Sequence, residues 1–384
     1  MTDRILVTGA TGFIGARLVE TLARRGHRVR VATSDFRHCV RVARFPVELV
    51  RADLCDPPSL ARAVEGCDTV FHLAYRFGGR PADERRANVE GTRALAEAAA
   101  ARRVRRFVHF SSVATYGPAF DGDLTEATTR RPSSQSYAKT KLLIETMLHE
   151  LHTNRGLALT ILQPTFVYGP FGGYFTARMI QQVTAGRVAL PAGRSGLCNA
   201  VYVDDVVGAA LLASQSDAAV GETFLVSAER PVTWRDFYGA YERMAGRDSV
   251  VFMDEADLAT AHRRERAQRG FGRRVHNALA RRPHVRERLL ALPPQGWIVR
   301  GGRALLPHAA QRQISDWYER FWTATPAQAD PVFVPDPDTC ALYVSKTHVR
   351  IDKARQTLGF VPAFDLENGM AKTARWARWA HLIC

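Results

Sequence analysis

Residues 7–15 read Val-Thr-Gly-Ala-Thr-Gly-Phe-Ile-Gly, and this stretch decides the fold. An apolar run with the length of a buried strand precedes the glycines. After them, Ile14, Leu18 and Leu22 recur every fourth residue, which is the pattern of one helix face. Gly26 predicts the end of that helix. A strand, a glycine-rich turn and a helix in this order are typical of a unit that binds the phosphates of a dinucleotide.

Each glycine of the turn has its own expected role. Gly9 permits the tight turn, Gly12 lets the backbone approach a pyrophosphate, and Gly15 lets the helix pack closely on the strand. An ordinary turn between a strand and a helix is the alternative interpretation. The residues of the turn that we predict to bind a cofactor are Gly9, Thr11, Gly12, Phe13, Ile14 and Gly15.

A second motif pairs a tyrosine with a lysine in the run Ser-Tyr-Ala-Lys-Thr-Lys at 136–141. On a helix, Tyr137 and Lys141 share one face, so the lysine ammonium can favour the ionised phenol. Ser112 stands at the end of an apolar run and can hold the substrate oxygen that the phenol protonates or deprotonates. This spacing recurs by chance in unrelated chains, but behind a dinucleotide turn it indicates a catalytic site.

The glycine spacing resembles that of the extended short-chain dehydrogenase/reductase family, which includes nucleotide-sugar epimerases and dehydratases. Further stretches similar to that family cover about residues 1–250 and 340–375. In chain order they are Asp53-Leu54, His72-Leu73-Ala74, Asn88 to Thr92, Phe110 to Gly117, Pro164 to Pro170, Val201 to Val206, and Leu358 to Pro362.

The resemblance implies roles for individual residues. Tyr137 is the expected acid/base, Lys141 is expected to lower its pKa and to hold the nicotinamide ribose, and Asn88 to support a water-linked proton path. Ser112 rather than Ser111 corresponds to the catalytic hydroxyl. The further cofactor contacts that we predict are Thr33, Arg37, Asp53, Leu54, Leu73, Ala74, Asn88, Tyr137, Lys141 and Pro164, and the predicted substrate contacts are Ser112, Thr165, Arg194 and Asn199.

Alternating strands and helices predict an α/β fold with a doubly wound parallel Rossmann sheet. We expect an NAD(P)-binding domain over residues 1–165, with later returns near 200–226, and a smaller, interleaved C-terminal substrate domain over 166–384. The predicted strands lie near 4–8, 28–33, 47–50, 69–73, 107–111, 158–163 and 223–226, and two predicted helices cover 92–101 and 137–152.

The end of the second predicted strand bears on the choice of cofactor. Family members that prefer NAD place an acid there to hold the ribose diol. This chain has Thr33, with Asp35 two positions later and Arg37 and Arg41 beyond. A missing carboxylate and nearby guanidinium groups favour NADP over NAD. The alternative is that Asp35 bends back to the ribose.

The sequence is compatible with three hypotheses about the type of reaction. Family dehydratases carry an Asp-Glu pair where this chain has Val113 and Ala114, so 4,6-dehydration is not expected. Cys198 occupies the place where sugar-nucleotide enzymes often hold diphosphate with an arginine, for which Arg194 could substitute. A nucleotide-sugar epimerase or ketoreductase is placed first. A reductase or dehydrogenase of an apolar alcohol or ketone, similar to steroid dehydrogenases and flavonol reductases, is second, and a non-catalytic NADP-binding regulator is third.

Residues 255–330 depart from the family pattern and carry fourteen arginines against seven acids. A mainly helical lid over the substrate cleft is the favoured interpretation, and a peripheral membrane contact is the alternative. The net charge of +15 does not indicate nucleic-acid binding, because only five of the 53 basic residues are lysine. Arginine-heavy coding in a GC-rich genome explains that bias.

The remaining composition is typical of a cytoplasmic enzyme with a small-molecule substrate. No apolar run approaches the length of a membrane span. The first predicted strand begins almost at once, so no signal peptide is expected. Six scattered cysteines predict reduced thiols and neither disulfides nor a metal site. By resemblance we expect a homodimer that pairs through the helices near 92–101 and 137–152.

Overall fold

A computed structural model describes residues 3–78, 80–117, 120–131, 136–263 and 332–383. The chain divides into two compact units, of which the larger comprises 1–184, 193–250 and 337–384 and the smaller comprises 185–192 and 251–336. Most of the segment 255–330, and with it the expected lid, lies outside the described residues. The expected division at residue 165 separates a cofactor-binding domain from a substrate-binding domain, and it stays a prediction.

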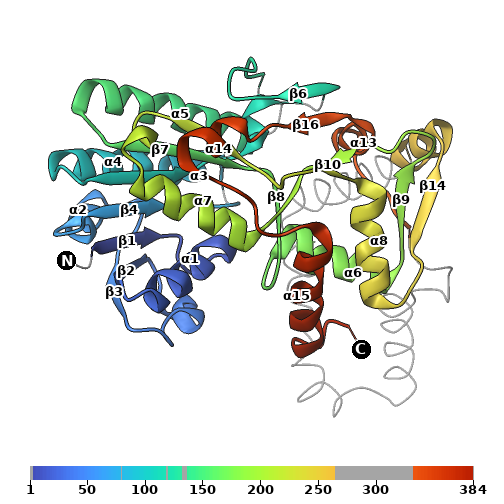
Figure 1. The fold of residues 1–384 in the computed structure, drawn as a ribbon, viewed down its shortest axis with the longest axis horizontal. Helices are drawn as coiled ribbons and strands as arrows, with labels where there is room; N and C mark the ends of the chain where they lie inside the picture. Colours follow the sequence, from blue (N-terminus) through green and yellow to red (C-terminus); the bar gives the residue numbers. More distant parts are fainter. Residues whose placement is uncertain (1–2, 79, 118–119, 132–135, 264–331, 384) are drawn as a thin grey trace, which may run out of the picture. The chain divides into compact units, whose positions relative to one another are not determined.

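The larger unit is built around a seven-stranded parallel sheet with the strand order β12-β7-β5-β4-β1-β2-β3 (Figure 1). The strand order reverses between β1 and β4, and open sheets of this type bind ligands at such a point. The predicted doubly wound α/β fold is therefore confirmed. The strands are β1 Arg4–Thr8, β2 Arg28–Thr33, β3 Val47–Arg51, β4 Thr69–His72, β5 Arg106–Phe110, β7 Leu159–Pro164 and β12 Thr223–Val226.

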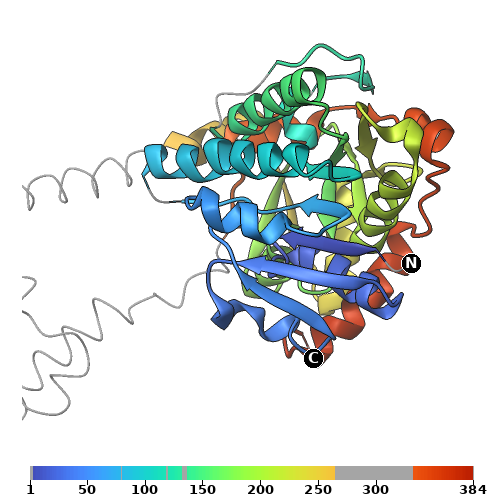
Figure 2. The same cartoon turned by 90° about the vertical axis from the view of Figure 1, so that its left-hand side faces the viewer.

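Helices cover both faces of this sheet, and each face has its own apolar core. On one face α1, α7 and α14 bury residues such as Leu18, Val206 and Leu358 against the strands. On the other, α2, α4 and α5 bury residues such as Leu95 and Leu148. Figure 2 shows α4 in cyan and α5 in green side by side on that second face. The bounds are α1 Phe13–Arg24, α2 Pro57–Val64, α4 Gly91–Ala101, α5 Ser136–Arg155, α7 Val203–Gln215 and α14 Asp352–Leu358.

The predicted strands agree with the observed ones to within one residue at either end. The helix that opens the chain ends at Arg24, and Gly26 takes the positive φ of 80° that few other residues adopt. The predicted helix over 137–152 is real but extends to Arg155. Buried strands and glycine-terminated helices leave clear sequence patterns, which is why these elements were predictable.

Shorter elements complete the larger unit. α8 begins with a capping box, in which Thr233 and Asp236 exchange hydrogen bonds, and it ends at Gly246 in the left-handed conformation. Three two-stranded ladders pair β8 with β11, β10 with β13, and β6 with β16. These elements are β6 Gly122–Leu124, β8 Phe166–Tyr168, β10 Leu197–Cys198, β11 Ala200–Tyr202, β13 Val232–Thr233, β16 Thr347–Val349, α3 Pro81–Arg85, α6 Arg178–Ala185, α8 Trp234–Ala245, α13 Pro337–Val344 and α15 Leu366–Trp379.

The smaller unit contains a three-stranded sheet in the order β14-β9-β15, formed by β14 Val250–Met253, β9 Arg187–Pro191 and β15 Val332–Phe333. A helical stretch over 255–263 follows β14. In both units, the described helices are too short or too polar to cross a membrane. The described cysteines form no disulfide, and the described part of the chain holds no cluster of metal-binding side chains.

Candidate functional site

The glycine-rich turn forms a backbone cradle at the end of β1. Gly9 has a φ of 68°, and the Gly12 amide donates a hydrogen bond to the Gly9 carbonyl over 3.0 Å. α1 then begins at Phe13, without a side-chain cap and without an acid in its first turn. Free amide groups at a helix N-terminus bind anions such as a pyrophosphate. The turn therefore fits the phosphates of a dinucleotide.

The tight packing around this cradle explains two of its glycines. A Cβ atom on Gly15 would lie 2.2 Å from the Gly9 carbonyl oxygen, so only glycine lets α1 pack this closely on the turn. A Cβ atom on Gly9 would lie 2.6 Å from the Ala74 amide nitrogen. Leu73 and Ala74, which we predict to contact the cofactor, thus lie directly against the turn. Ile14 packs against the core of that face of the sheet.

His72 ties together three elements behind the cradle. Its Nδ1 lies 2.7 Å from the Thr8 hydroxyl on β1, and its Nε2 lies 2.8 Å from the Thr92 hydroxyl on α4. Burial lowers the pKa of His72 to about 3, and the nearby Lys141 ammonium acts in the same direction. A neutral imidazole between two hydroxyls is a structural link, which holds the ends of β1 and β4 beside each other.

The end of β2 carries the residues that bear on the adenosine half of the cofactor. Thr33 donates its hydroxyl hydrogen to the Asp35 carbonyl over 3.0 Å. The Asp35 carboxylate accepts four hydrogen bonds from Arg37, one from its amide and three from its guanidinium. Asp53, at the end of β3, accepts from the Cys55 amide over 2.8 Å. Contacts of Thr33, Arg37, Asp53 and Leu54 with a cofactor stay predictions.

The three predicted catalytic residues come together at the end of β5. Lys141 on α5 is buried, and its Nζ donates a hydrogen bond to the Phe110 carbonyl over 2.7 Å. Tyr137 lies one helical turn earlier on the same face, with the centre of its ring 6.0 Å from that Nζ. The Ser112 hydroxyl interacts with the Tyr137 phenol and acts to lower its pKa. Phe110 and Ser112, at the end of β5, thus lie against the side of α5 that carries Tyr137 and Lys141.

The electrostatics of this group differ from the sequence expectation in one respect. Burial raises the pKa of the Tyr137 phenol, and the Ser112 hydroxyl only opposes that rise. Burial lowers the pKa of Lys141 to about 7, because the interior disfavours the charged ammonium. Lys141 therefore carries less charge near neutral pH than we expected, so it favours the ionised phenol less.

Two aromatic residues that the sequence reasoning missed lie beside Tyr137. The Tyr75 ring meets the Tyr137 ring edge-on at 5.1 Å, and the Phe77 ring stacks on it at 5.7 Å. Phe77 is 73% exposed. Asn88 holds this segment in place, because its side chain accepts from the Arg76 amide over 2.7 Å and donates to the Arg76 carbonyl over 2.9 Å. The predicted role of Asn88 in a proton path stays a prediction.

Three further predicted residues are engaged within the protein. Pro164 ends β7, and the next hydroxyl, that of Thr165, donates to the Val226 carbonyl and lies 3.2 Å from the Ser227 hydroxyl. Asn199 is buried, and its amide side chain bonds to the backbone of both Thr347 and Val349 on β16. The structure gives Asn199 a role in holding β16, and the substrate contacts of Thr165 and Asn199 stay predictions.

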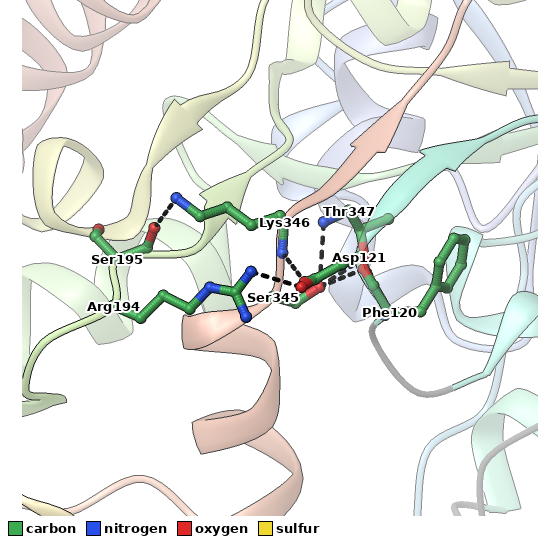
Figure 3. A network of polar contacts seen from close by, with 7 residues as sticks. All are labelled: Phe120, Asp121, Arg194, Ser195, Ser345, Lys346 and Thr347. Atoms are coloured by element: carbon green, nitrogen blue, oxygen red, sulfur yellow. Dashed lines mark hydrogen bonds and ion pairs between the residues drawn. The ribbon is translucent and has the colours of Figure 1, made fainter.

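Arg194 lies in an exposed polar network (Figure 3). Its Nη2 donates to the Asp121 carboxylate over 2.6 Å, and the other Asp121 oxygen accepts from the Lys346 amide over 2.8 Å. The Lys346 ammonium in turn donates to the Ser195 carbonyl. Because both side chains of the ion pair are about half exposed, the pair is weakly stabilising and open to exchange with another anion. The contact of Arg194 with a substrate stays a prediction.

Comparison with known proteins places the chain in a family. Residues 5–227 match the model of the NAD dependent epimerase/dehydratase family. "Sterol demethylase protein B" of Methylococcus capsulatus is 35% identical over 233 residues, which are 58% of this chain and 69% of the relative. The "3 beta-hydroxysteroid dehydrogenase/Delta 5-->4-isomerase" of Mycobacterium tuberculosis is 30% identical over 251 residues, which are 61% of this chain and 67% of the relative.

The fold is shared with more distant proteins. A UDP-glucose 4-epimerase from Thermotoga maritima, solved with UDP-glucose, matches with a TM-score of 0.66 and 21% identity, covering 98% of this chain and 99% of that one. At that identity the likeness shows the fold alone. The family match covers the glycine turn, the Ser112 strand end and the Tyr137–Lys141 helix, and it confirms the resemblance to extended short-chain dehydrogenases. The chain therefore belongs to the NAD-dependent epimerase/dehydratase family.

Proposed function

We propose that the protein is an NAD(P)-dependent reductase or dehydrogenase of an apolar alcohol or ketone. The observation that carries this choice is the aromatic pair Tyr75 and Phe77 against the Tyr137 ring. An exposed phenylalanine beside an acid/base suits an apolar, ring-shaped substrate better than a sugar. The sterol and steroid names of the two relatives support the same substrate class.

The residues of the site have defined tasks in this reaction. The Gly9–Gly15 turn and the N-terminus of α1 would hold the pyrophosphate of the cofactor. When bound, the nicotinamide supplies or accepts the hydride. The Ser112 hydroxyl hydrogen-bonds the substrate oxygen, and the Tyr137 phenol gives that oxygen a proton in reduction or removes one in oxidation. When the Lys141 side chain is protonated, it places a positive charge near the Tyr137 phenol.

We further propose that NADP(H) is the preferred cofactor. The Asp35 carboxylate at the end of β2 is engaged by Arg37, so a 2′-phosphate would meet a neutralised acid rather than a free one. Arg41 and Arg44 add positive charge to the same segment. The family description names NAD, which makes the opposite preference the alternative.

The second candidate is a nucleotide-sugar epimerase, which the sequence alone favours. Its support is Arg194, an exposed arginine whose pairing with Asp121 can open to receive a diphosphate. Its weakness is Cys198, which is fully buried at the position where an arginine would grip that group. We therefore place this candidate below the apolar substrate.

A ligand panel separates the two candidates. The protein is warmed with NADP(H) or NAD(H) and with a fused-ring hydroxy compound, a fused-ring ketone, or a UDP-, GDP- or dTDP-sugar. A ligand at a hundred times its dissociation constant stabilises the fold by about 2.7 kcal/mol, which a melting curve resolves. We expect the fused-ring compounds to stabilise the protein and to change nicotinamide absorbance. Stabilisation by the sugar nucleotides alone would contradict the proposal.

A further inference from the structure

Three consecutive residues at the end of β5 contact three positions on one face of α5. The Phe110 carbonyl accepts from Lys141, and the Ser111 hydroxyl donates to the Glu145 carboxylate. The Ser112 hydroxyl interacts with the Tyr137 phenol and acts to lower its pKa. The helix positions 137, 141 and 145 are four residues apart, so they form a single row. The strand end and the helix are thereby held in one register, and Glu145 is the member of the row that the mechanism does not use.

Glu145 is a buried acid with a dedicated counter-charge. Its side chain is 1% exposed, and its second carboxylate oxygen forms an ion pair with Arg130. A buried carboxylate is costly unless it is paired and hydrogen-bonded. Arg130 reaches it from the segment that follows β6, and its guanidinium lies 5.3 Å from the centre of the Tyr116 ring. The fold therefore keeps a carboxylate–guanidinium ion pair one helical turn from Lys141.

A second chain of hydrogen bonds connects Glu145 to Ser112 through Gln163 and Thr115. Gln163 on β7 donates to Glu145 over 2.8 Å and lies 3.2 Å from the Thr115 hydroxyl. Thr115 in turn donates its hydroxyl hydrogen to the Ser112 carbonyl over 3.0 Å. Glu145 is thus linked to the backbone of Ser112 both through Ser111, which precedes it, and through Thr115, which follows it.

We propose that Glu145, neutralised by Arg130, is a positioning residue that places the Ser112 hydroxyl against the Tyr137 phenol. Neither side chain touches the reacting atoms. The inference rests on the proposed function only for the roles of Ser112 and Tyr137. An ion pair that merely stabilises the fold would lower the melting temperature when broken and would leave the titration of Tyr137 unchanged, so the two roles are separable.

The titration of Tyr137 supplies a readout that needs no substrate. Burial raises the pKa of this phenol and the interaction with the Ser112 hydroxyl opposes the rise, so losing that interaction raises the pKa further. A hydrogen bond to a charged group contributes about 1.5 kcal/mol or more, which corresponds to about one pKa unit. Fluorine NMR of protein labelled with 3-fluorotyrosine follows each phenol separately, and the Tyr137 resonance is the one absent from Tyr137→Phe.

The experiment compares Glu145→Gln, Arg130→Met and Arg130→Lys with wild type. We expect the pKa of Tyr137 to rise by about one unit in the first two variants. Arg130→Lys, which keeps the charge, should recover part of the shift. Glu150→Gln is the matched control, because it removes a charge from an exposed position of the same helix and should leave the titration unchanged. Cofactor affinity should stay within about twofold in all of them, since the glycine turn is distant in sequence and separately held.

A double-variant cycle makes the result decisive. In a Ser112→Ala background, Glu145→Gln should add no further shift, because the interaction that it perturbs is already gone. Additive shifts, or a lower melting temperature with an unchanged Tyr137 titration, would overturn the proposal. If Glu145→Gln does not fold, the comparison of Arg130→Met with Arg130→Lys decides in the same way. A failure of every substrate in the ligand panel would contradict the proposed function and leave this titration untouched.

Discussion

Asp35 and Arg37 form a closed ion pair at the end of β2, in which the Arg37 guanidinium donates to one Asp35 oxygen over 2.6 and 2.9 Å. The pairing lowers the pKa of Asp35 to about 2, so this carboxylate is ionised at any pH at which the protein would be assayed. If this pair binds a ribose diol the cofactor is NAD, and if it binds a 2′-phosphate the cofactor is NADP.

We predict that Arg37→Ala weakens NADP(H) binding about tenfold or more and leaves NAD(H) binding within a few-fold. The variant removes a cation that a 2′-phosphate can contact and frees the Asp35 carboxylate to repel that phosphate. Titrations of protein fluorescence with both cofactors measure the effect. Arg102→Ala, at an exposed position after α4, is the control. An NAD(H) preference that Arg37→Ala does not alter would instead identify Asp35 as the ribose ligand.

The glycine turn gives a prediction with a matched control inside the chain. Gly15→Ala should abolish tight cofactor binding and lower stability by a few kcal/mol, because its Cβ would lie 2.2 Å from the Gly9 carbonyl oxygen. Gly208→Ala should be neutral or stabilise by about 1 kcal/mol, since its Cβ would meet no atom within 4 Å on helix α7. Denaturant unfolding and cofactor titration test both. Equal effects of the two variants would be inconsistent with this packing.

Phe77 provides a test of substrate class. Replacing it with Ala should raise KM for an apolar ring-shaped ketone about tenfold, because the stacked face beside Tyr137 is lost. Cofactor affinity and the melting temperature should change little, since Phe77 is 73% exposed. Steady-state kinetics with varied ketone measure this effect. Phe252→Ala, another exposed phenylalanine, is the control. An unchanged KM would remove the aromatic pair as support for an apolar substrate.

Lys141 makes the stability of the cofactor-free protein depend on pH. Burial lowers its pKa to about 7 from an ordinary value of 10.5. Between these two values the unfolded chain binds a proton that the folded protein does not, so this lysine makes stability rise with pH. Lys141→Met should therefore melt a few degrees above wild type at pH 7 and below, and the gap should narrow towards pH 10. A gap that is constant from pH 6 to 10 would show that Lys141 does not titrate as its burial implies.

The sequence was sufficient for the sheet and for the placement of Tyr137 and Lys141 on one helix face, because both depend on local patterns. A glycine turn between a strand and a helix, and a tyrosine four residues before a lysine, specify their own backbone context. The partners of Glu145 were not predictable in this way. Arg130, Gln163 and Ser111 are separated along the chain and meet only when the sheet and helix have packed.

Asn199 shows the converse limit. We predict it as a substrate contact beside Cys198, and the structure shows its side chain hydrogen-bonded to the backbone of β16. A motif reveals the type of residue but not its hydrogen-bond partners, and those depend on tertiary contacts. Tyr75 and Phe77 were missed for the same reason, because aromatic residues after a strand do not by themselves indicate which ring they will face.

Turnover by Tyr137→Phe tests the central claim most directly. The measurement is the rate of nicotinamide absorbance change with a fused-ring ketone and NADPH, for wild type, Tyr137→Phe and the exposed control Tyr174→Phe. Because the phenol proton is needed in the transition state and the pyrophosphate is held by the glycine turn, we predict a loss of about a thousandfold or more in kcat with cofactor affinity nearly unchanged. Tyr174→Phe should match wild type. A Tyr137→Phe rate within a few-fold of wild type would contradict the account.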